Sequence, residues 1–127
     1  MNQGGFHLLG RSSDKIRTPD DIAKTAATCQ KLALDGLILI GATHTLTDGA
    51  LLADNFLKSG IKTVVNCVPC TIDNNIHHKD LEISVGFATS SHTYSTLISN
   101  LMIDASSNTK YWYFIRLMGR DPSHLTL

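Results

Sequence analysis

Apolar residues follow two kinds of spacing in the first half of this chain. From Ile22 to Ala33 they recur every three or four positions, which predicts an amphipathic helix. Residues 37–40 and 62–68 are instead short, largely apolar runs bounded by turn-forming residues. Such runs are typical of strands buried on both faces of a parallel sheet. The pattern therefore predicts a helix followed by two buried strands.

The ends of this first helix are marked by residues that favour helix boundaries. Thr18 is placed to cap the helix, and Pro19 suits the first helical position. Acidic residues follow in the first turn, where they complement the helix dipole, and residues 35–36 are expected to end the helix. Cys29 lies on the apolar stripe, so we interpret it as a core residue and not as a nucleophile.

The second half of the chain continues the alternation of helices and strands. After a loop over residues 41–48, a helix is expected to bury Leu52 and Phe56. A long helix is predicted over residues 84–105, and a third strand, dense in aromatic and β-branched side chains, over residues 111–117. Alternating helices and strands imply right-handed crossovers and a parallel sheet, so the predicted fold class is α/β.

Length and composition narrow the class of protein further. The chain has 127 residues, of which 43% are apolar and 17% charged, with no net charge. We therefore expect one domain with a substantial core, and no nucleic acid or membrane surface as a partner. The sequence contains no apolar run long enough to cross a membrane and no signal-peptide pattern at its N-terminus. Three cysteines do not suggest a disulfide framework, which favours a reducing, cytoplasmic setting.

Polar side chains collect where the three predicted strands end. Residues 41–47, 69–75 and 118–120 supply hydroxyls, amides, one carboxylate and one guanidinium. Because ligands bind beyond the carboxyl ends of strands in open α/β sheets, this rim suits a phosphorylated, hydroxyl-rich ligand. Arg120 would bind the anion, and Asp73 would take a proton from an attacking hydroxyl. The stretch around Asp73 is also compatible with an ordinary turn.

Three other features have both a functional and a plain structural interpretation. Residues 10–13, Gly-Arg-Ser-Ser, fit a phosphate cradle or a solvated turn. Cys67 and Cys70 have the spacing of a redox dithiol, but turn formers follow them where that chemistry needs a helix. His77 and nearby acids invite a metal site, although a solvated loop explains them better because zinc needs ligands at restrictive spacings.

The sequence as a whole resembles the phosphofructokinase family. It is most similar to the pyrophosphate-dependent branch, including the alpha-like members of plants and apicomplexan parasites. The resemblance is carried by motifs in family order across the chain, at residues 4–13, 34–37, 69–75, 85–87 and 113–120. It implies a Rossmann-like three-layer αβα fold with a parallel sheet. It also implies an enzyme that transfers a phosphoryl group from ATP or pyrophosphate to the 1-hydroxyl of fructose 6-phosphate, as in glycolysis.

The resemblance also assigns roles to particular residues. Asp73 falls on the family's catalytic base, and Thr71 and Ile72 fall on the substrate-binding strand end. The sugar-phosphate contact falls on Met118, Gly119 and Arg120, which form one motif in this sequence. On the donor-phosphate side the resemblance points to Arg11, Gly41, Thr43 and Thr45.

Departures from the family pattern lie on the side of the phosphoryl donor and the metal. The family uses Mg²⁺ and places an Asp where this chain has Thr43, and Asn75 replaces its second carboxylate. Cys70 stands where pyrophosphate-dependent members have a Lys. Phosphoryl transfer depends on neutralising charge through the metal, so we expect a degenerate metal and donor site and a weak or silent lobe. No metal ligand is assigned in this chain.

The resemblance implies that residues 1–127 form a single partial phosphofructokinase domain, the central segment of a longer chain. The expected partners are fructose 6-phosphate, ATP or pyrophosphate, and the remaining lobe or lobes in a homo- or hetero-oligomer. The alternative interpretation is a non-catalytic regulatory or subunit-contact lobe that binds sugar phosphate. The sequence leaves open the phosphoryl donor, the effectors and the choice between an active and a regulatory lobe.

Overall fold

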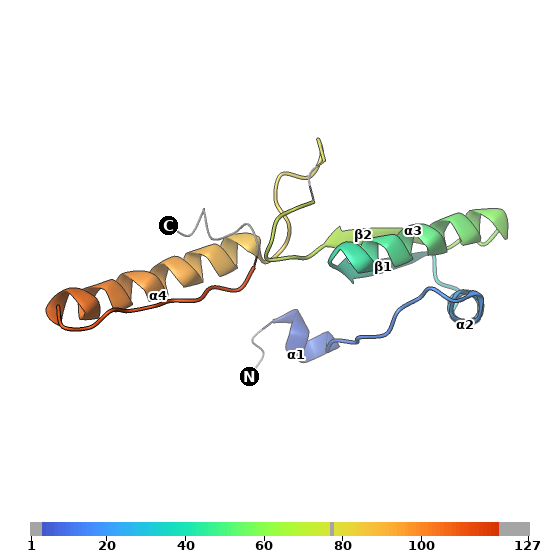
Figure 1. Ribbon diagram of the computed structural model, residues 1–127. Coiled ribbons are helices and arrows are strands. Elements are labelled where there is room, and N and C mark those ends of the chain that lie inside the picture. The colour runs from blue at the N-terminus through green and yellow to red at the C-terminus, as the bar shows by residue number, and fades with distance from the viewer. Residues whose placement is uncertain (1–3, 77, 120–127) are drawn as a thin grey trace. The chain divides into compact units, whose positions relative to one another are not determined.

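The computed structural model describes residues 4–76 and 78–119, which divide into two compact units. Met1–Leu37 and Thr47–Asn66 form the first unit, and Ile38–Leu46 and Cys67–Leu127 form the second. The elements, in chain order, are α1 (Gly5–Leu9), α2 (Pro19–Lys31), β1 (Gly36–Gly41), α3 (Thr43–Lys58), β2 (Val64–Pro69) and α4 (Phe87–Ser107) (Figure 1). None of the helices in these described ranges is long and apolar enough to cross a membrane.

Helix α2 begins as the sequence predicts. The Thr18 hydroxyl accepts a hydrogen bond from the amide of Asp21, and the Asp21 carboxylate accepts one from the amide of Thr18, which completes a capping box. The helix ends at Lys31, before the predicted stop at residues 35–36. Ala33 adopts a left-handed conformation with φ of 48°, so the helix cannot continue through it. The prediction that Ala33 belongs to the helix is therefore wrong.

The first unit is built around three buried side chains. Cys29 from α2 packs with Leu52 and Phe56 from α3, and all three are at most 2% exposed. Partly buried apolar side chains surround them, from Ile16, Ile22, Ala26, Leu34, Leu37, Ile61 and Val65. Burying an aliphatic or aromatic side chain of this size contributes about 1.5–3 kcal/mol. The predicted burial of these three residues is confirmed.

Strands β1 and β2 form the predicted parallel pair and confirm the α/β class. The amide of Val64 donates to the carbonyl of Asp35 at 2.9 Å where the pair begins, and the amide of Cys70 donates to the carbonyl of Gly41 at 2.9 Å where it ends. The predicted burial of both faces is wrong, because exposure alternates along β1. Leu37 packs on the α2–α3 core, whereas Ile38 on the opposite face is 64% exposed. Described residues cover only one face.

Helix α3 begins earlier than the sequence predicts. Residues 43–48, expected in a loop, form its first turns, so the loop after β1 is reduced to Ala42. Asp48, the last residue of the predicted loop, is 6% exposed on this helix. Its carboxylate accepts hydrogen bonds from Nε of Arg17 at 2.8 Å and from the amide of Ile16 at 3.3 Å. This ion pair attaches the segment before α2 to α3, and no local pattern in the sequence indicated it.

Helix α4 confirms the predicted long helix and begins after Gly86, whose φ is 91°. Phe87 is buried and Tyr94 and Ile98 are half-buried on one face of this helix, whereas Met102 is 63% exposed. The face is therefore most buried at its N-terminal end, at Phe87.

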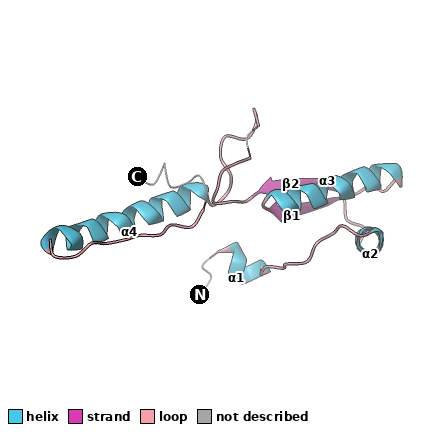
Figure 2. Cartoon of the chain, viewed as in Figure 1, coloured by secondary structure: helices cyan, strands magenta, loops and turns pink. Residues whose placement is uncertain are grey.

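The predicted third strand is absent from the described part of the chain. Figure 2 draws the residues that follow α4 as a loop, which in Figure 1 turns back along the helix. The aromatic side chains of this segment face solvent, with Trp112 91% and Phe114 94% exposed. A strand needs a neighbouring ladder for its amides and carbonyls, and the segment forms no ladder with β1 or β2. The β-prone composition alone was therefore an insufficient signal.

Candidate functional site

The ends of β1 and β2 lie next to each other in the second unit. The hydrogen bond from the Cys70 amide to the Gly41 carbonyl joins them directly. The loop that carries Asp73 and the N-terminus of α3 consequently start from the same edge of the sheet. Two of the three predicted strand ends are thereby brought together, as an α/β sheet with parallel strands predicts.

The third predicted strand end is not shown at this edge. Met118 is 70% exposed in a segment without strand structure, and Gly119 has a φ of 105°. Arg120, the predicted anion-binding residue, lies outside the described residues. The assignment of these three residues to a sugar-phosphate contact therefore stays a prediction.

Asp73 is held within a tight turn after β2. Its amide donates a 3.1 Å hydrogen bond to the hydroxyl oxygen of Thr71, two positions earlier. Thr71, Ile72 and Asp73 are all half-buried. A threonine at this position uses its hydroxyl to replace a backbone turn bond, which fixes the local path of the chain. The stretch around Asp73 is therefore a turn, as the alternative interpretation expected, and this turn also sets the position of the Asp73 carboxylate.

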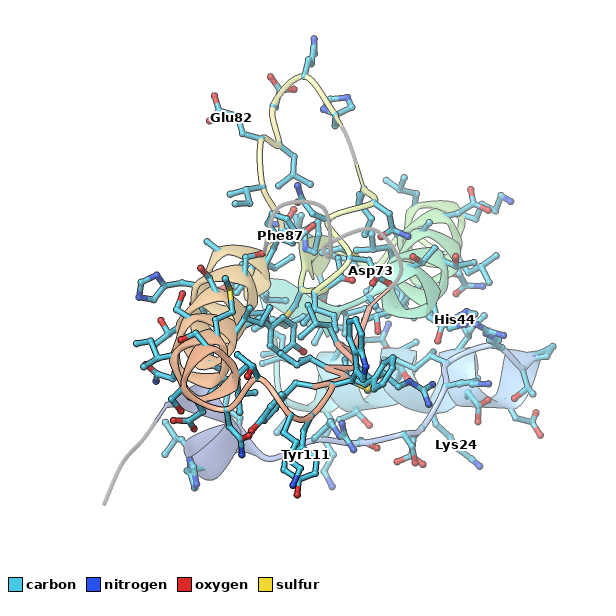
Figure 3. All side chains as sticks on the ribbon, turned by 60° about the vertical axis from the view of Figure 1, so that its left-hand side comes forward. Lys24, His44, Asp73, Glu82, Phe87 and Tyr111 are labelled. Carbon is cyan, nitrogen blue, oxygen red and sulfur yellow. The ribbon has the colours of Figure 1, made fainter. Side chains whose placement is uncertain are left out.

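Residues 70–85 form a closed excursion from the sheet edge. Cys70 and Val85 make an isolated parallel bridge, in which the Val85 amide donates to the Pro69 carbonyl at 3.0 Å and the Thr71 amide donates to the Val85 carbonyl at 3.2 Å. The two ends of the excursion are therefore paired with each other. Figure 3 labels Asp73 near the base of this loop and Glu82 toward its far end.

A second closure lies just inside this bridge, at Asn74. Its backbone is left-handed, with φ of 47°, and its side-chain oxygen accepts a 2.7 Å hydrogen bond from the amide of Ser84. Ser84 is 2% exposed. From the sequence, Asn74 was only one of the amides at a strand end and Ser84 had no role, although Asn is the non-glycine residue that best tolerates this conformation and bonds to nearby backbone.

Three of the four predicted donor-phosphate residues, Gly41, Thr43 and Thr45, lie at the N-terminus of α3. A Cβ atom added at Gly41 would come within 3.0 Å of Cγ2 of Thr45 and closer still to its other side-chain atoms, so only glycine fits there. Thr43 and His44 belong to the first helical turn, and Figure 3 labels His44. A helix N-terminus presents amides and a partial positive charge to an anion. The early start of α3 therefore places these amides beside the strand end.

Arg11 lies in the first unit, in an exposed segment that makes its own local turn. The hydroxyl of Ser12 donates to the Asp14 carboxylate at 2.6 Å and accepts a 3.1 Å hydrogen bond from the Asp14 amide. Gly10 has a φ of 72°. These contacts fit the solvated-turn interpretation of this segment.

Neither the redox nor the zinc interpretation gains support. Cys67 lies in β2, and three residues of extended chain span about 10 Å, beyond the roughly 7 Å limit for a disulfide. Burial raises the pKa of the Cys67 thiol, which opposes thiolate formation. His78 and Asp80 are exposed and form a 3.3 Å contact, while His77 lies outside the described residues. Over residues 4–76 and 78–119, no group of three potential metal ligands occurs.

The sequence profile of the phosphofructokinase family matches residues 1–127. Over 126 residues, 99% of this chain, the sequence is 47% identical to the pyrophosphate–fructose 6-phosphate 1-phosphotransferase subunit beta 1 of Arabidopsis thaliana and covers 22% of it. The same length is 46% identical to the pyrophosphate–fructose 6-phosphate 1-phosphotransferase of Treponema pallidum, again with 22% of that protein covered. It is 45% identical to subunit alpha of the Solanum tuberosum protein, of which it covers 20%.

The chain thus spans about a fifth of the length of these curated relatives. It is similar to alpha and beta subunits to almost the same degree, so the identities do not separate the two types. The match to the family profile extends over every residue, from the Gly-rich start through the Asp73 loop to the C-terminal segment. The chain belongs to the phosphofructokinase family.

Proposed function

We propose that this chain supplies the sugar-phosphate side of a 6-phosphofructokinase, with a weakened donor side. The observation that carries the proposal is the hydrogen bond between Cys70 and Gly41, which joins the Asp73 loop to the N-terminus of α3. An acceptor side and a donor side must adjoin for phosphoryl transfer, which depends chiefly on positioning. The names of the similar proteins support fructose 6-phosphate as the acceptor.

Asp73 is the proposed general base. Its carboxylate takes the proton of the sugar 1-hydroxyl while that oxygen bonds to the terminal phosphorus of the donor. The bond between this phosphorus and the bridging oxygen breaks, which releases orthophosphate from pyrophosphate or ADP from ATP. Thr71 fixes the turn that presents Asp73, and the half-buried Ile72 lines the same strand end. Met118, Gly119 and Arg120 are proposed to bind the sugar phosphate.

The donor phosphates are proposed to lie against the N-terminus of α3. Gly41 leaves room for the Thr45 side chain, and the hydroxyls of Thr43 and Thr45 and the helix amides supply hydrogen-bond donors. Arg11 is a further candidate for this side, from the family resemblance alone. Pyrophosphate is named as the donor for the similar proteins, and ATP remains the alternative.

The residues present do not fit a strong Mg²⁺ site. Magnesium is held by carboxylates together with substrate phosphates, and a threonine hydroxyl at position 43 and an amide at position 75 carry no charge. Asp73 is the only acidic side chain among residues 70–75. We therefore propose a slow lobe, whose donor side lacks charge compensation, and route no step of the reaction through a metal.

The second candidate is a non-catalytic lobe that binds sugar phosphate and regulates or contacts another subunit. The neutral side chains of Thr43 and Asn75 favour it, and the relatives include alpha and beta subunits of one named activity. Under either function the chain would associate with further phosphofructokinase lobes, in a homo- or hetero-oligomer. A cytoplasmic location remains a prediction from cysteine usage.

Binding of fructose 6-phosphate to the intact protein tests the part that both functions share. We expect Arg120→Ala to weaken the affinity at least tenfold in a calorimetric titration, because a charged hydrogen bond contributes about 1.5–3 kcal/mol. Arg116→Ala is the matched control, since Arg116 precedes the assigned motif. An affinity unchanged by Arg120→Ala would remove sugar-phosphate binding from the proposed role of this segment.

A further inference from the structure

The loop that carries Asp73 is closed twice, by different kinds of contact. The outer closure is the Cys70–Val85 bridge, which belongs to the backbone and tolerates many side chains. The inner closure depends on one side chain, because the carboxamide oxygen of Asn74 accepts the hydrogen bond from Ser84. A substitution at position 74 therefore changes the inner closure while leaving the outer one in place.

Asp73 lies between two anchors. On its N-terminal side, its own amide is bonded to Thr71 at 3.1 Å. On its C-terminal side, the next residue, Asn74, is bonded at 2.7 Å to Ser84. Ser84 itself is buried at the base of α4 and precedes Val85 in the bridge. The backbone on both sides of the carboxylate is therefore hydrogen-bonded to residues next to the sheet edge.

The conformation of Asn74 makes this anchor specific. A φ of 47° is strained for most L residues, and glycine, asparagine and aspartate adopt it most readily. Glycine satisfies the backbone requirement but has no oxygen to accept the Ser84 hydrogen bond. Aspartate satisfies both requirements. The backbone requirement and the hydrogen bond can thus be separated by substitution.

We propose that Asn74 is a positioning residue for Asp73, whose side-chain bond to the Ser84 amide holds the base at a fixed distance from the acceptor hydroxyl. The inference rests on the proposed function, in which Asp73 is the base. A misplacement of about 1 Å lowers the rate of an oriented reaction by on the order of 100-fold. The bond between Asn74 and Ser84 affects the carboxylate and does not itself contact the substrate.

The test compares three variants of the intact protein. Asn74→Gly is expected to lower kcat for phosphorylation of fructose 6-phosphate 10- to 100-fold, with KM changed less than threefold. Asn74→Asp is expected to recover most of the kcat, with the acid limb of the pH–rate profile moved to higher pH because a second carboxylate opposes ionisation of Asp73. Asn108→Gly is the control, since the Asn108 side chain also accepts a backbone amide, from an exposed position after α4.

Hydrogen exchange of the Ser84 amide reports the bond without any turnover. Exchange should accelerate in Asn74→Gly and return toward the original rate in Asn74→Asp. Unchanged exchange, or a kcat within twofold of the original in Asn74→Gly while Asp73→Asn loses 100-fold or more, would overturn the positioning role and leave the proposed function standing. A kcat unaffected by Asp73→Asn would instead overturn the proposed function.

Discussion

The amide of Cys70 donates a 2.9 Å hydrogen bond to the carbonyl of Gly41. Gly41 is the last residue of β1, and Cys70 is the first residue after β2. This contact brings together two segments whose polar residues lie far apart in the sequence. A substitution of Gly41 or Thr43 therefore alters the same edge of the sheet from which the Asp73 loop begins.

Restoring the missing acids should strengthen the reaction. Thr43→Asp combined with Asn75→Asp is expected to raise kcat about 10-fold or more and to lower the Mg²⁺ concentration needed for half-maximal rate, because carboxylates hold the metal that offsets phosphate charge. The measurement is a Mg²⁺ titration of initial rates. Thr96→Asp, the same chemical change at an exposed position of α4, should leave both the kcat and the Mg²⁺ requirement unaltered. No gain in the double variant would contradict the weakened-donor proposal.

Gly41 should resist substitution because Thr45 lies over its Cα. Gly41→Ala is expected to destabilise the fold by about 1–3 kcal/mol, the usual cost of forcing extra atoms into a packed place. Gly36 at the other end of β1 is the matched control, since a Cβ there would meet only the Val64 carbonyl at 3.8 Å. Denaturant unfolding gives both values. Equal stabilities of Gly41→Ala and Gly36→Ala would show that Thr45 does not close this space.

The Arg17–Asp48 pair should contribute more to the free energy of unfolding than the exposed Lys58–Asp54 pair, which also involves α3. Arg17→Ala leaves the buried Asp48 carboxylate without this cation and is expected to cost about 2 kcal/mol, discounted because Arg17 itself is 40% exposed. Lys58→Ala, which breaks the exposed Lys58–Asp54 pair, should cost less than about 0.5 kcal/mol. Urea unfolding of both variants makes the comparison, and a larger loss in Lys58→Ala would refute it.

The capping box of α2 should show a dependence of stability on pH. Hydrogen bonds from the Thr18 side chain, first, and from its backbone lower the pKa of Asp21 below its ordinary value of 3.8. A carboxyl with a lowered folded pKa contributes stability above its unfolded pKa, and this contribution disappears as the pH falls through the folded value. Thr18→Ala should therefore flatten the fall in Tm as the pH drops below about 4. An equally steep fall in the variant would contradict this origin.

Local signals in the sequence were sufficient where a short stretch determines its own structure. The Thr18–Asp21 cap needs only four consecutive residues. The spacing of the apolar residues in α3 predicts which side of that helix is buried. The start of α3 was missed because the threonines and the histidine at residues 43–45 have weak helix propensity. This part of the helix is stabilised by a residue outside it, since Asp48 pairs with Arg17.

The remaining misses involve partners distant in sequence. Residues 111–117 have strand composition, but a strand is defined by pairing with another strand, and this segment pairs with neither β1 nor β2. Ile38 belongs to an apolar run, yet described residues cover only the opposite face of β1. The Asn74–Ser84 contact joins residues ten positions apart through one side chain, which no periodicity predicts. The position of Asp73 at a strand end was predictable because it follows directly from the β2 run.

The turnover of Asp73→Asn tests the central claim most directly. The intact protein is assayed with fructose 6-phosphate and pyrophosphate, and separately with ATP, beside the unaltered protein. We predict that kcat falls at least about 100-fold, the typical loss on removing a general base, while KM for fructose 6-phosphate and Tm stay close to their original values. A kcat unchanged by Asp73→Asn, with altered regulation or assembly, would contradict the account and assign this segment to a non-catalytic lobe.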